Sequence, residues 1–347
     1  MKPNKKATWF KTALFISVTI TVVACKDTNR RHPDASLRFA QLPITYSAVT
    51  FIADAKGFYK REGLDYVSFS VPAGPDVVTS LRAKSSARAD AGGIAITPVA
   101  TMIGGGNEPV LLATTMTSDT QTKLVTFTAT GITNDPATLK GKRIGVTYYT
   151  NGDVYLSRLL AKGGLTRKDV LIVGNKPADV RNSLVQGSID AAILWDPFVV
   201  QVGRDYKALV AAGKTKDRGS VQVFVDPPLY TLAFNIVTTR SALASKRDSL
   251  VKMLQGTIMA SEFIRKNPQE TQRMLEQWLG LQMGDLDNFM QTTDFHVYLD
   301  VPKVKLWMTG ELTWLKQMKS DTNVPTDLNP YIDSSLLKAV DNARVHE

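Results

Sequence analysis

The sequence predicts an α/β fold of two βαβ lobes that are joined by two crossing strands and followed by a helical C-terminal tail. Three observations lead to this prediction. Strand-like and helix-like segments alternate from residue 37, the alternation restarts near residue 141, and helical periodicity dominates from residue 241. Such a rhythm is typical of parallel βαβ units. The 347 residues also fit about two ordinary domains of roughly 150 residues each.

The first βαβ pattern covers residues 37–97. We expect strands where side chains alternate in polarity or where β-branched and aromatic residues gather, and helices where apolar residues recur at helical spacing. Gly63 suits the position just after a helix, where a positive φ is common. The predicted strands are 37–44, 66–71 and 89–97, and the predicted helices are 50–59 and a segment that begins near Asp76.

The pattern restarts after Gly141, and three long amphipathic segments follow in the tail. In this second half the predicted strands are 144–147, 169–173 and 191–194, the predicted helices of the α/β part are 154–161 and 178–186, and those of the tail are 250–266, 268–279 and 304–319.

Two β-rich stretches, 110–129 and 229–238, stand at the borders between these patterns. We expect each of them to run from one lobe to the other. Residues 37–120 and 237–347 would then form one lobe, and residues 121–236 the other. Two lobes joined by two crossings fit a hinged clamshell better than two independent domains.

The first 24 residues have the pattern of a secretory signal peptide. Four lysines and no acids precede an uncharged run of twelve residues, ALFISVTITVVA (13–24). A membrane-spanning helix needs about 20 apolar residues, so this run is too short to span a bilayer and has the length of a signal-peptide core. We therefore expect residues 1–24 to be removed as a lipoprotein signal peptide.

The run ends in Val22-Val23-Ala24-Cys25, which resembles a bacterial lipobox. The resemblance implies that Cys25 takes a diacylglycerol and that its amine takes an acyl chain such as palmitate. Two or more chains hold a protein stably at a membrane, so we expect a lipid anchor on a bacterial membrane that faces the periplasm or the cell exterior. The polar residues 25–36 would be a tether. An ordinary buried cysteine is the alternative.

Composition excludes several classes of function. The chain has one cysteine and three histidines, so disulfides, thiolate zinc sites and multi-histidine metal centres are not expected. Its formal net charge of +10 includes four lysines of the signal; without them the balance is 38 against 32, or +6. The charges are interleaved, so we expect no nucleic-acid partner. We also expect no cofactor, no bound metal and a monomer.

Four stretches in order resemble the ABC-transporter substrate-binding proteins of the sulfonate, nitrate, taurine and thiamine-precursor group. They are AKGFYKREGLD (55–65), ADAG (89–92), LKGKRIGV (139–146) and GSIDAAILWDPF (187–198). The likeness extends over residues 37–240. It implies a type II periplasmic-binding-protein fold with a ligand cleft between the lobes. It also implies delivery of a small solute to an ABC permease and its ATPase, without chemistry.

The candidate ligand-binding residues lie at the carboxyl ends of the predicted strands, where ligands of open α/β sheets bind. Several of these ends precede helices, whose N-termini favour anionic groups. The candidates are Ser47, Ala48, Gly74, Pro75, Ile96, Thr97, Tyr148, Thr150, Asn151, Gly152, Asp153, Trp195 and Asp196.

Each of these side chains also has a purely structural explanation. Ser47 and Asp153 can cap helices, Tyr148 can pack at the domain mouth, and Trp195 can belong to the core. Asp196 precedes a proline and can stabilise a turn. The sequence leaves both explanations open at each position.

The class of ligand also stays open. A sulfonate or similar oxyanion, nitrate and bicarbonate among them, suits helix N-termini and hydroxyl groups. Tyr148, Tyr149 and Trp195 suit an aryl sulfonate or an aminopyrimidine thiamine precursor. Asp153 and Asp196 suit an added amino group, as in taurine.

Two other functions remain as alternatives to a solute receptor. The same fold serves a pyrimidine-synthesising suicide enzyme, but the export signal and the lack of a second cysteine or a histidine pair argue against an enzyme. A sensory or docking lipoprotein that transports nothing is the other alternative.

Overall fold

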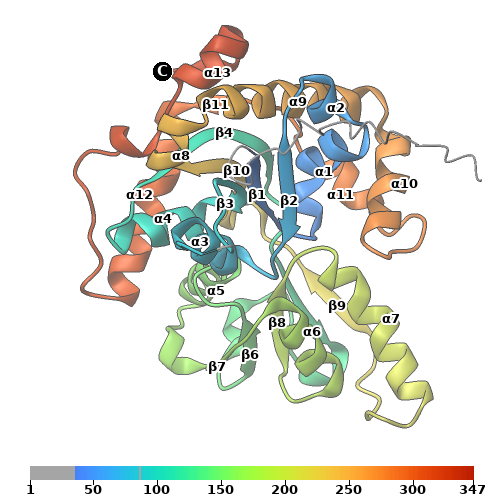
Figure 1. The fold of residues 1–347 in the computed structure, drawn as a ribbon. Coiled ribbons are helices and arrows are strands. Elements are labelled where there is room, and N and C mark those ends of the chain that lie inside the picture. The colour runs from blue at the N-terminus through green and yellow to red at the C-terminus, as the bar shows by residue number, and fades with distance from the viewer. Residues whose placement is uncertain (1–35, 86) are drawn as a thin grey trace, which may run out of the picture.

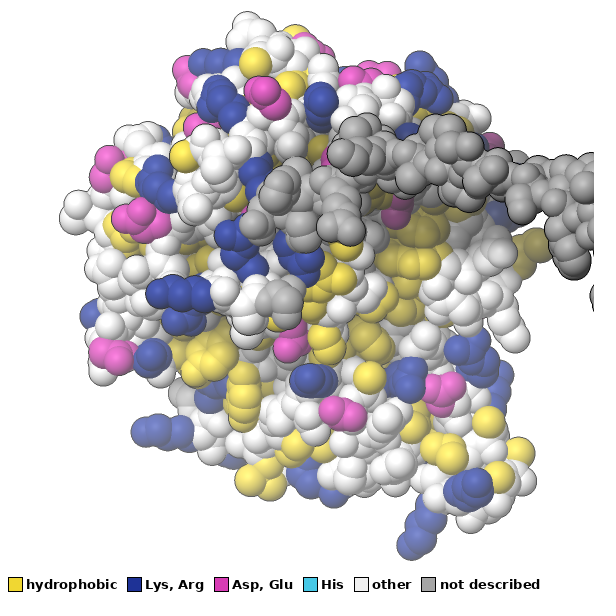
Figure 2. All heavy atoms as spheres, viewed as in Figure 1, with side chains coloured by type: hydrophobic (Ala, Val, Ile, Leu, Met, Phe, Trp, Pro, Cys, Tyr) yellow, Lys and Arg dark blue, Asp and Glu magenta, His cyan; other side chains and the backbone are white. Residues whose placement is uncertain are grey.

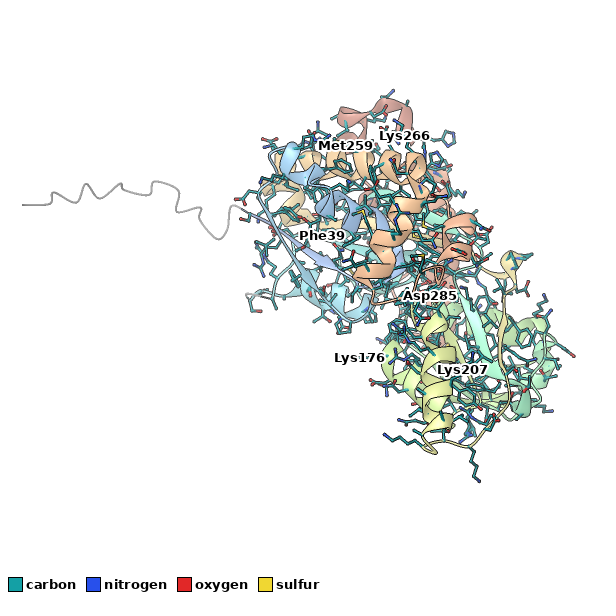
Figure 3. The ribbon with its side chains drawn as sticks, turned by 90° about the vertical axis from the view of Figure 1, so that its right-hand side faces the viewer. Phe39, Lys176, Lys207, Met259, Lys266 and Asp285 are labelled. Carbon is teal, nitrogen blue, oxygen red and sulfur yellow. The ribbon has the colours of Figure 1, made fainter. Side chains whose placement is uncertain are left out.

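The computed structural model describes residues 36–85 and 87–347, and these form two mixed α/β lobes (Figure 1). Each lobe contains a five-stranded sheet with the same plan. The first sheet has the order β2-β1-β3-β10-β4 and the second has β7-β6-β8-β5-β9. The side view separates the lobes, with Phe39 and Met259 in the first and Lys207 in the second (Figure 3).

The sheets have these strands, in spatial order. The first consists of β2 (Tyr66–Ser70), β1 (Leu37–Gln41), β3 (Ala91–Ala95), β10 (Leu232–Thr239) and β4 (Pro109–Ser118). The second consists of β7 (Leu171–Gly174), β6 (Arg143–Val146), β8 (Ala191–Leu194), β5 (Lys123–Phe127) and β9 (Val221–Phe224). Two short strands, β11 (Leu299–Asp300) and β12 (Val345–His346), pair with each other.

Helices cover both faces of each sheet. In the first lobe they are α1 (Ala48–Ala55), α2 (Phe58–Arg61), α3 (Gly74–Arg82), α4 (Ile96–Gly104), α8 (Arg240–Ser245), α9 (Arg247–Lys266), α10 (Pro268–Trp278), α11 (Asp287–Thr292), α12 (Val301–Met318) and α13 (Ser335–Val340). In the second they are α5 (Asn151–Lys162), α6 (Pro177–Gln186) and α7 (Phe198–Ala211).

Four strands of each sheet run in the same direction, and one strand, β10 in the first sheet and β5 in the second, is antiparallel to both of its neighbours. β1 pairs in parallel with β2 and β3, and β6 with β7 and β8. β5 follows the first crossing and runs antiparallel to β8, and β10 follows the second crossing and runs antiparallel to β3. Parallel strands covered on both faces are expected to be apolar throughout, and every residue of β3 and β8 is buried.

The chain crosses between the lobes twice, at residues 119–122 and 225–231. The boundary predicted between residues 236 and 237 therefore needs correction, because it falls inside β10, all of which belongs to the first sheet. One continuous apolar core extends from the first lobe through Tyr230 to Leu124 and Val154 of the second. A separate core beneath α6 and α7 fills the far face of the second sheet.

Several predicted elements differ from the structure in their bounds. The strand predicted over residues 37–44 ends at Gln41, and the one predicted over residues 169–173 begins at Leu171. The helix predicted over residues 50–59 is two helices, because Gly57 adopts a left-handed φ of 69° between α1 and α2. The strand predicted over residues 89–97 ends at Ala95, and Ile96 and Thr97 already belong to α4. The signal peptide, Cys25 and nearly all of the tether lie outside the described residues.

The described residues contain no helix that is long and apolar enough to cross a membrane. On the face of the molecule shown in Figure 2, lysine and arginine side chains are scattered over both lobes and interspersed with acids. This distribution is not the continuous basic stripe that a nucleic-acid-binding face presents.

The contact between α9 and α2 provides a test of the packing. A Cβ on Gly256 would lie 2.5 Å from Cδ1 of the buried Tyr59. We expect Gly256→Ala to lower the free energy of unfolding by about 1–3 kcal/mol, because overpacking forces the helices apart.

Gly203→Ala in α7 is the matched control, since a Cβ there meets nothing within 4 Å. It should leave the protein unchanged or stabilise it by up to about 1 kcal/mol, the usual gain from replacing glycine in a helix. Urea denaturation measures both, and equal effects would contradict the packing argument.

Candidate ligand-binding site between the two lobes

Three segments far apart in the sequence meet where the lobes join: the turn after β1, the first crossing and the residues after β8. The Thr45 hydroxyl donates to the carbonyl oxygen of Asp196 at 2.9 Å. The Tyr46 hydroxyl donates to the carbonyl oxygen of Gln121 at 3.3 Å. Both bonds tie the first lobe to groups at or beyond the crossing.

A buried ion pair lies at the centre of this junction. Lys123 pairs with Leu194 across the antiparallel β5–β8 ladder, which places its ammonium beside the residues that follow β8. Lys123 Nζ lies 2.7 Å from Asp196 Oδ2, and the two side chains are only 7% and 3% exposed. Burying such a pair costs desolvation energy that good geometry must offset, so its presence here calls for a functional explanation.

Around the ion pair, polar atoms are buried without a hydrogen-bond partner. Among the described residues nine such side-chain atoms are found, and five of them belong to residues of this junction. We call these residues, Ser47, Gln121, Trp195 and Asp196, the inner cluster. The five atoms are Ser47 Oγ, Gln121 Nε2, Gln121 Oε1, Trp195 Nε1 and Asp196 Oδ1. Each unpaired buried group costs about 1–3 kcal/mol. A concentration of them indicates a place where a ligand supplies the missing partners.

Aromatic rings form one wall of the inner cluster. The ring centroids of Tyr46 and Trp195 are 6.1 Å apart. Phe198 packs edge-on against Trp195, with a centroid distance of 6.2 Å and an interplanar angle of 81°. Burial and the nearby charge of Asp196 raise the pKa of Tyr46 well above its usual range. Tyr46 therefore stays a neutral hydrogen-bond donor.

The first turn of α5 approaches the same wall from the second lobe. Asn151 Nδ2 donates to Thr122 Oγ1 at 2.8 Å, which fixes the start of the helix against the crossing. A Cβ on Gly152 would lie 3.4 Å from Cζ3 of Trp195 and 3.3 Å from a methyl carbon of Ile193. Glycine at this position lets the helix backbone come close to the indole ring.

The structure brings five of the predicted residues together: Ser47, Asn151, Gly152, Trp195 and Asp196. Ser47, Trp195 and Asp196 belong to the inner cluster. Gly152 packs against Trp195, and Asn151 is bonded to Thr122, the neighbour of Gln121 in the chain. The other predicted residues lie elsewhere.

Asp153 faces away from the inner cluster. Its Oδ1 lies 2.7 Å from Arg167 Nη1, and its Oδ2 accepts the backbone N–H of Tyr149 at 3.0 Å. Burial raises the pKa of Asp153, and the Arg167 charge opposes that rise. Both oxygens of Asp153 are thus engaged by protein groups, and its contact with a ligand stays a prediction.

Tyr148 and Tyr149 are exposed, each by 42%. The ring of Tyr148 covers Gly174 at the end of the edge strand β7, so close that a Cβ there would overlap it. The Thr150 hydroxyl donates to the carbonyl oxygen of Thr147 at 2.7 Å. These residues shape the surface and the turn before α5 and form no part of the inner cluster.

The remaining candidates belong to the first lobe. Ala48 and Ile96 are buried in its apolar core. Gly74, followed by Pro75 in the first turn of α3, packs closely on Pro98, since a Cβ there would lie 2.7 Å from Pro98 Cγ.

Thr97 takes part in a second inter-lobe contact, at the second crossing. Its hydroxyl donates to Oε2 of the buried Glu311 at 2.8 Å and lies 3.2 Å from the Tyr230 hydroxyl. From the second lobe, Arg158 reaches within 3.7 Å of Glu311 Oε1 and donates to the carbonyl oxygen of Leu229 at 3.1 Å. This contact braces α12 against α5 and leaves Thr97 engaged.

Sequence reasoning missed Tyr46, Gln121 and Lys123. Tyr46 lies in a strand end that the sequence did single out, next to Ser47. Lys123 had a weak signal, a lysine at the start of the β-rich run KLVTF. Gln121 had none, because a glutamine in a connecting segment is ordinary.

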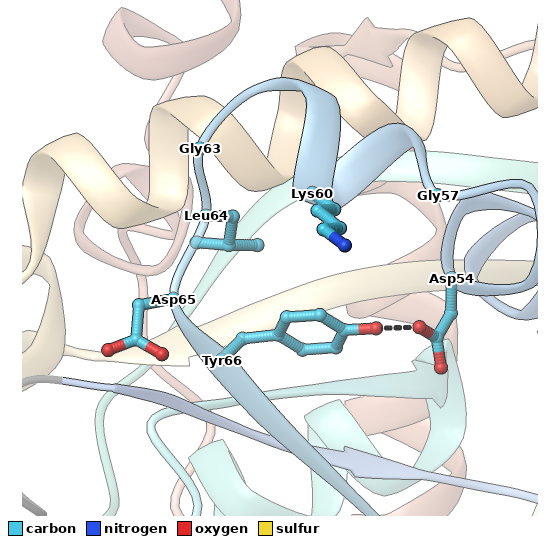
Figure 4. Close-up of a pocket in the computed structure, with 7 residues that line it drawn as sticks. All are labelled: Asp54, Gly57, Lys60, Gly63, Leu64, Asp65 and Tyr66. Carbon is cyan, nitrogen blue, oxygen red and sulfur yellow. Dashed lines mark hydrogen bonds between the residues drawn. The ribbon is translucent and has the colours of Figure 1, made fainter.

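A hollow on the first lobe, between α1, α2 and β2, is separate from the inner cluster (Figure 4). All of its walls come from the first lobe, and Asp54 there accepts a hydrogen bond from the Tyr66 hydroxyl. Burial, aided by that bond, raises the pKa of Tyr66 above its usual range. Because no residue of the second lobe lines this hollow, closure of the lobes does not act on it.

Comparison with known proteins places the chain in a family. The model of the NMT1/THI5-like family matches residues 44–271, about two thirds of the chain. The chain belongs to the NMT1/THI5-like family. The matched segment includes every residue of the inner cluster, both crossings and the whole second lobe.

The relatives of this NMT1/THI5-like chain are described either as binding proteins or as pyrimidine phosphate synthases. A protein of Brucella abortus described as a binding protein is 24% identical over 250 residues, or 70% of each chain. A 4-amino-5-hydroxymethyl-2-methylpyrimidine phosphate synthase of Uromyces fabae is 32% identical over 149 residues, which is 43% of this chain and 42% of the relative.

Among solved structures, the alkanesulfonate-binding protein SsuA of Xanthomonas axonopodis pv. citri, bound to MOPS, superposes with a TM-score of 0.69. Its sequence identity is 19%, and the match covers 86% of this chain and 98% of SsuA. The NMT1/THI5-like chain therefore has the periplasmic-binding-protein fold, as the sequence predicted.

The buried Glu311 predicts a pH dependence of stability. Burial raises the pKa of Glu311 to about 7, against the opposing effects of Thr97 and Arg158. In the unfolded chain the same carboxyl titrates near 4.5. Between these values the folded protein binds the extra proton, so the stability that this group contributes is complete at low pH and is lost as the pH rises through 7.

We expect the free energy of unfolding to fall between about pH 5 and pH 8, by roughly 1.4 kcal/mol for each unit of pKa shift. Glu311→Gln should flatten that slope, since the amide keeps the shape without titrating. Urea denaturation at both pH values measures it. An unchanged slope in the variant would assign the pH dependence to other groups.

Proposed function

We propose that the chain is the extracytoplasmic solute-binding component of an ABC importer. It captures a small organic solute between its lobes and delivers it to a permease that works with an ATPase. The observation that supports this most strongly is the inner cluster, in which residues of both lobes and of the first crossing hold buried polar atoms without a hydrogen-bond partner. The fold shared with an alkanesulfonate-binding protein adds support.

The chemistry of the inner cluster favours a solute with an N–H donor. Asp196 Oδ1 is an acceptor without a partner, and a plain oxyanion placed beside it has no donor and would leave it unpaired. Trp195 Nε1, Ser47 Oγ and Gln121 Nε2 offer donors for acceptor atoms on the same solute. An aminosulfonate and an aminopyrimidine both have this combination.

Ring stacking and burial suit a flat organic body next to these polar groups. Tyr46 and Trp195 supply the aromatic surface. The names of the relatives, one a pyrimidine phosphate synthase and one an alkanesulfonate-binding protein, are compatible with either head group. The shared feature, an amino group that Asp196 accepts, is the part that we propose.

Capture depends on movement of the lobes. The unpaired atoms of the inner cluster have almost no exposed area, so a solute reaches them only when the lobes separate. Since Ser47 belongs to one lobe and Trp195 to the other, the closed form offers more partners than the open form. A solute therefore favours closure by binding the closed form more tightly. We propose binding without chemistry.

A panel of ligands tests the proposed function. Taurine and 4-amino-5-hydroxymethyl-2-methylpyrimidine represent amino-bearing solutes, and ethanesulfonate and nitrate lack an amino group. A true ligand should raise the stability by about 2.7 kcal/mol at a hundredfold excess over its Kd. We expect one amino-bearing compound to give the largest concentration-dependent rise in melting temperature.

Two variants connect the panel to the inner cluster. Asp196→Asn should weaken the amino-bearing ligand by about 10- to 100-fold, because it removes a charged hydrogen bond. Trp195→Phe keeps a ring and deletes the N–H, with an expected loss of about tenfold or less. Asp248→Asn, at an exposed position in the first turn of α9, is the control. Silence of the whole panel, with no solute retained in native mass spectrometry, would favour a sensory or docking role.

We further propose that lipid on Cys25 holds the protein at a bacterial membrane as a monomer. The lipobox-like sequence before Cys25 supports this. In cells, Cys25→Ser should move the protein from the membrane fraction to the soluble fraction, while Cys25 alone should incorporate labelled palmitate. Membrane retention of the variant would contradict the anchor.

A further inference from the structure

A groove lies between the lobes outside the inner cluster, with a volume of about 440 Å³. Pro43, Pro72 and Trp278 line it from the first lobe, and Pro177 and Phe198 from the second. Its volume lies within the range of roughly 300–1,000 Å³ that small-molecule pockets occupy.

The walls of the groove are rigid and apolar. Four of the eleven lining residues are prolines, whose rings are short and whose φ is fixed, so they cannot turn inward to fill the space. The orientation of the Trp278 ring is fixed by stacking on Phe51, with a centroid distance of 4.2 Å and an interplanar angle of 9°. The apolar surface thus stays available.

The groove is continuous with the inner cluster through the chain and through a ring contact. Trp195 and Asp196 are followed directly by Pro197 and Phe198, both of which line the groove. Phe198 also meets the Trp195 ring at 6.2 Å. The residues that follow Asp196 therefore form a wall that the groove shares with the inner cluster.

The charges at the rim of the groove favour neither sign. Lys176 and Asp179 are both exposed lining residues on the second lobe, and neither forms an ion pair with another described residue. Figure 3 places Lys176 on the side of the second lobe nearest the first. Because one cation and one anion lie at the same rim, the groove attracts neither an anion nor a cation in particular. Its apolar walls therefore suit an uncharged, apolar group.

We propose that the groove holds an uncharged alkyl or aryl substituent of the solute whose polar head binds the inner cluster. This inference rests on the proposed solute-binding function. The protein then prefers substituted, elongated amino-bearing solutes to the smallest members of their class. Recognition is divided: the inner cluster selects the polar head, and the groove selects the body.

Calorimetric titration of the full chain in detergent with two pairs of probes tests this. The pairs are taurine with N-cyclohexyltaurine, and 4-aminopyrimidine with 5-benzyl-4-aminopyrimidine. In the pair whose head binds, the longer member should bind at least about tenfold more tightly, because each methylene removed from water contributes a factor of about four.

Variants from both walls locate the gain. Ala178→Phe places a ring in the groove from an exposed position, and Trp278→Ala removes the opposite wall. Both should cancel the preference for the longer probe and leave the shorter probe unchanged. Ala161→Phe on the exposed face of α5 and Trp307→Ala on α12 are the matched controls.

The outcomes separate this inference from the proposed function. Equal binding of the two members of a pair would overturn the groove proposal and leave the solute receptor intact. A preference that both groove variants leave unchanged would overturn it as well. Failure of all four probes to bind would overturn the proposed ligand class together with the groove.

Discussion

The ion pair between Lys123 and Asp196 is the constraint on which the junction of the lobes depends. Both side chains are largely buried, so each charge needs the other as a partner, and the pair holds the first crossing against the end of β8. The Thr45 bond to the Asp196 carbonyl then adds the first lobe to the same point. Removal of one partner alone would leave an uncompensated buried charge, which typically costs about 3–5 kcal/mol.

The pair also determines what the inner cluster is able to bind. Lys123 satisfies one carboxylate oxygen of Asp196 and leaves the other without a partner. The lysine thereby orients the carboxylate and leaves one acceptor oxygen free for a ligand. In the free protein the unpaired oxygen carries a desolvation penalty. A ligand donor that pairs with this oxygen removes the penalty, and the free energy so released adds to the binding energy.

The sequence allowed the fold to be predicted because strand-like and helix-like segments alternate along the chain and the alternation restarts after Gly141. It also singled out Ser47, Trp195 and Asp196, which the structure brings together, since strand carboxyl ends meet at one edge of a sheet. It did not predict the ion pair of Asp153, whose side chain α5 directs toward Arg167. It failed at Gln121 because the partners of a crossing segment depend on how two lobes dock, which no local pattern records.

The position of β10 has a consequence for how the chain is built. This strand lies between β3 and β4 and pairs with both, although the whole second lobe separates it from them in the sequence. Until β10 is available, β3 and β4 each have an unpaired inner edge. The second lobe, which is formed by one continuous segment, is able to assemble first during synthesis. Completion of the first sheet waits for a distant strand, and contacts over such separations are slow to form.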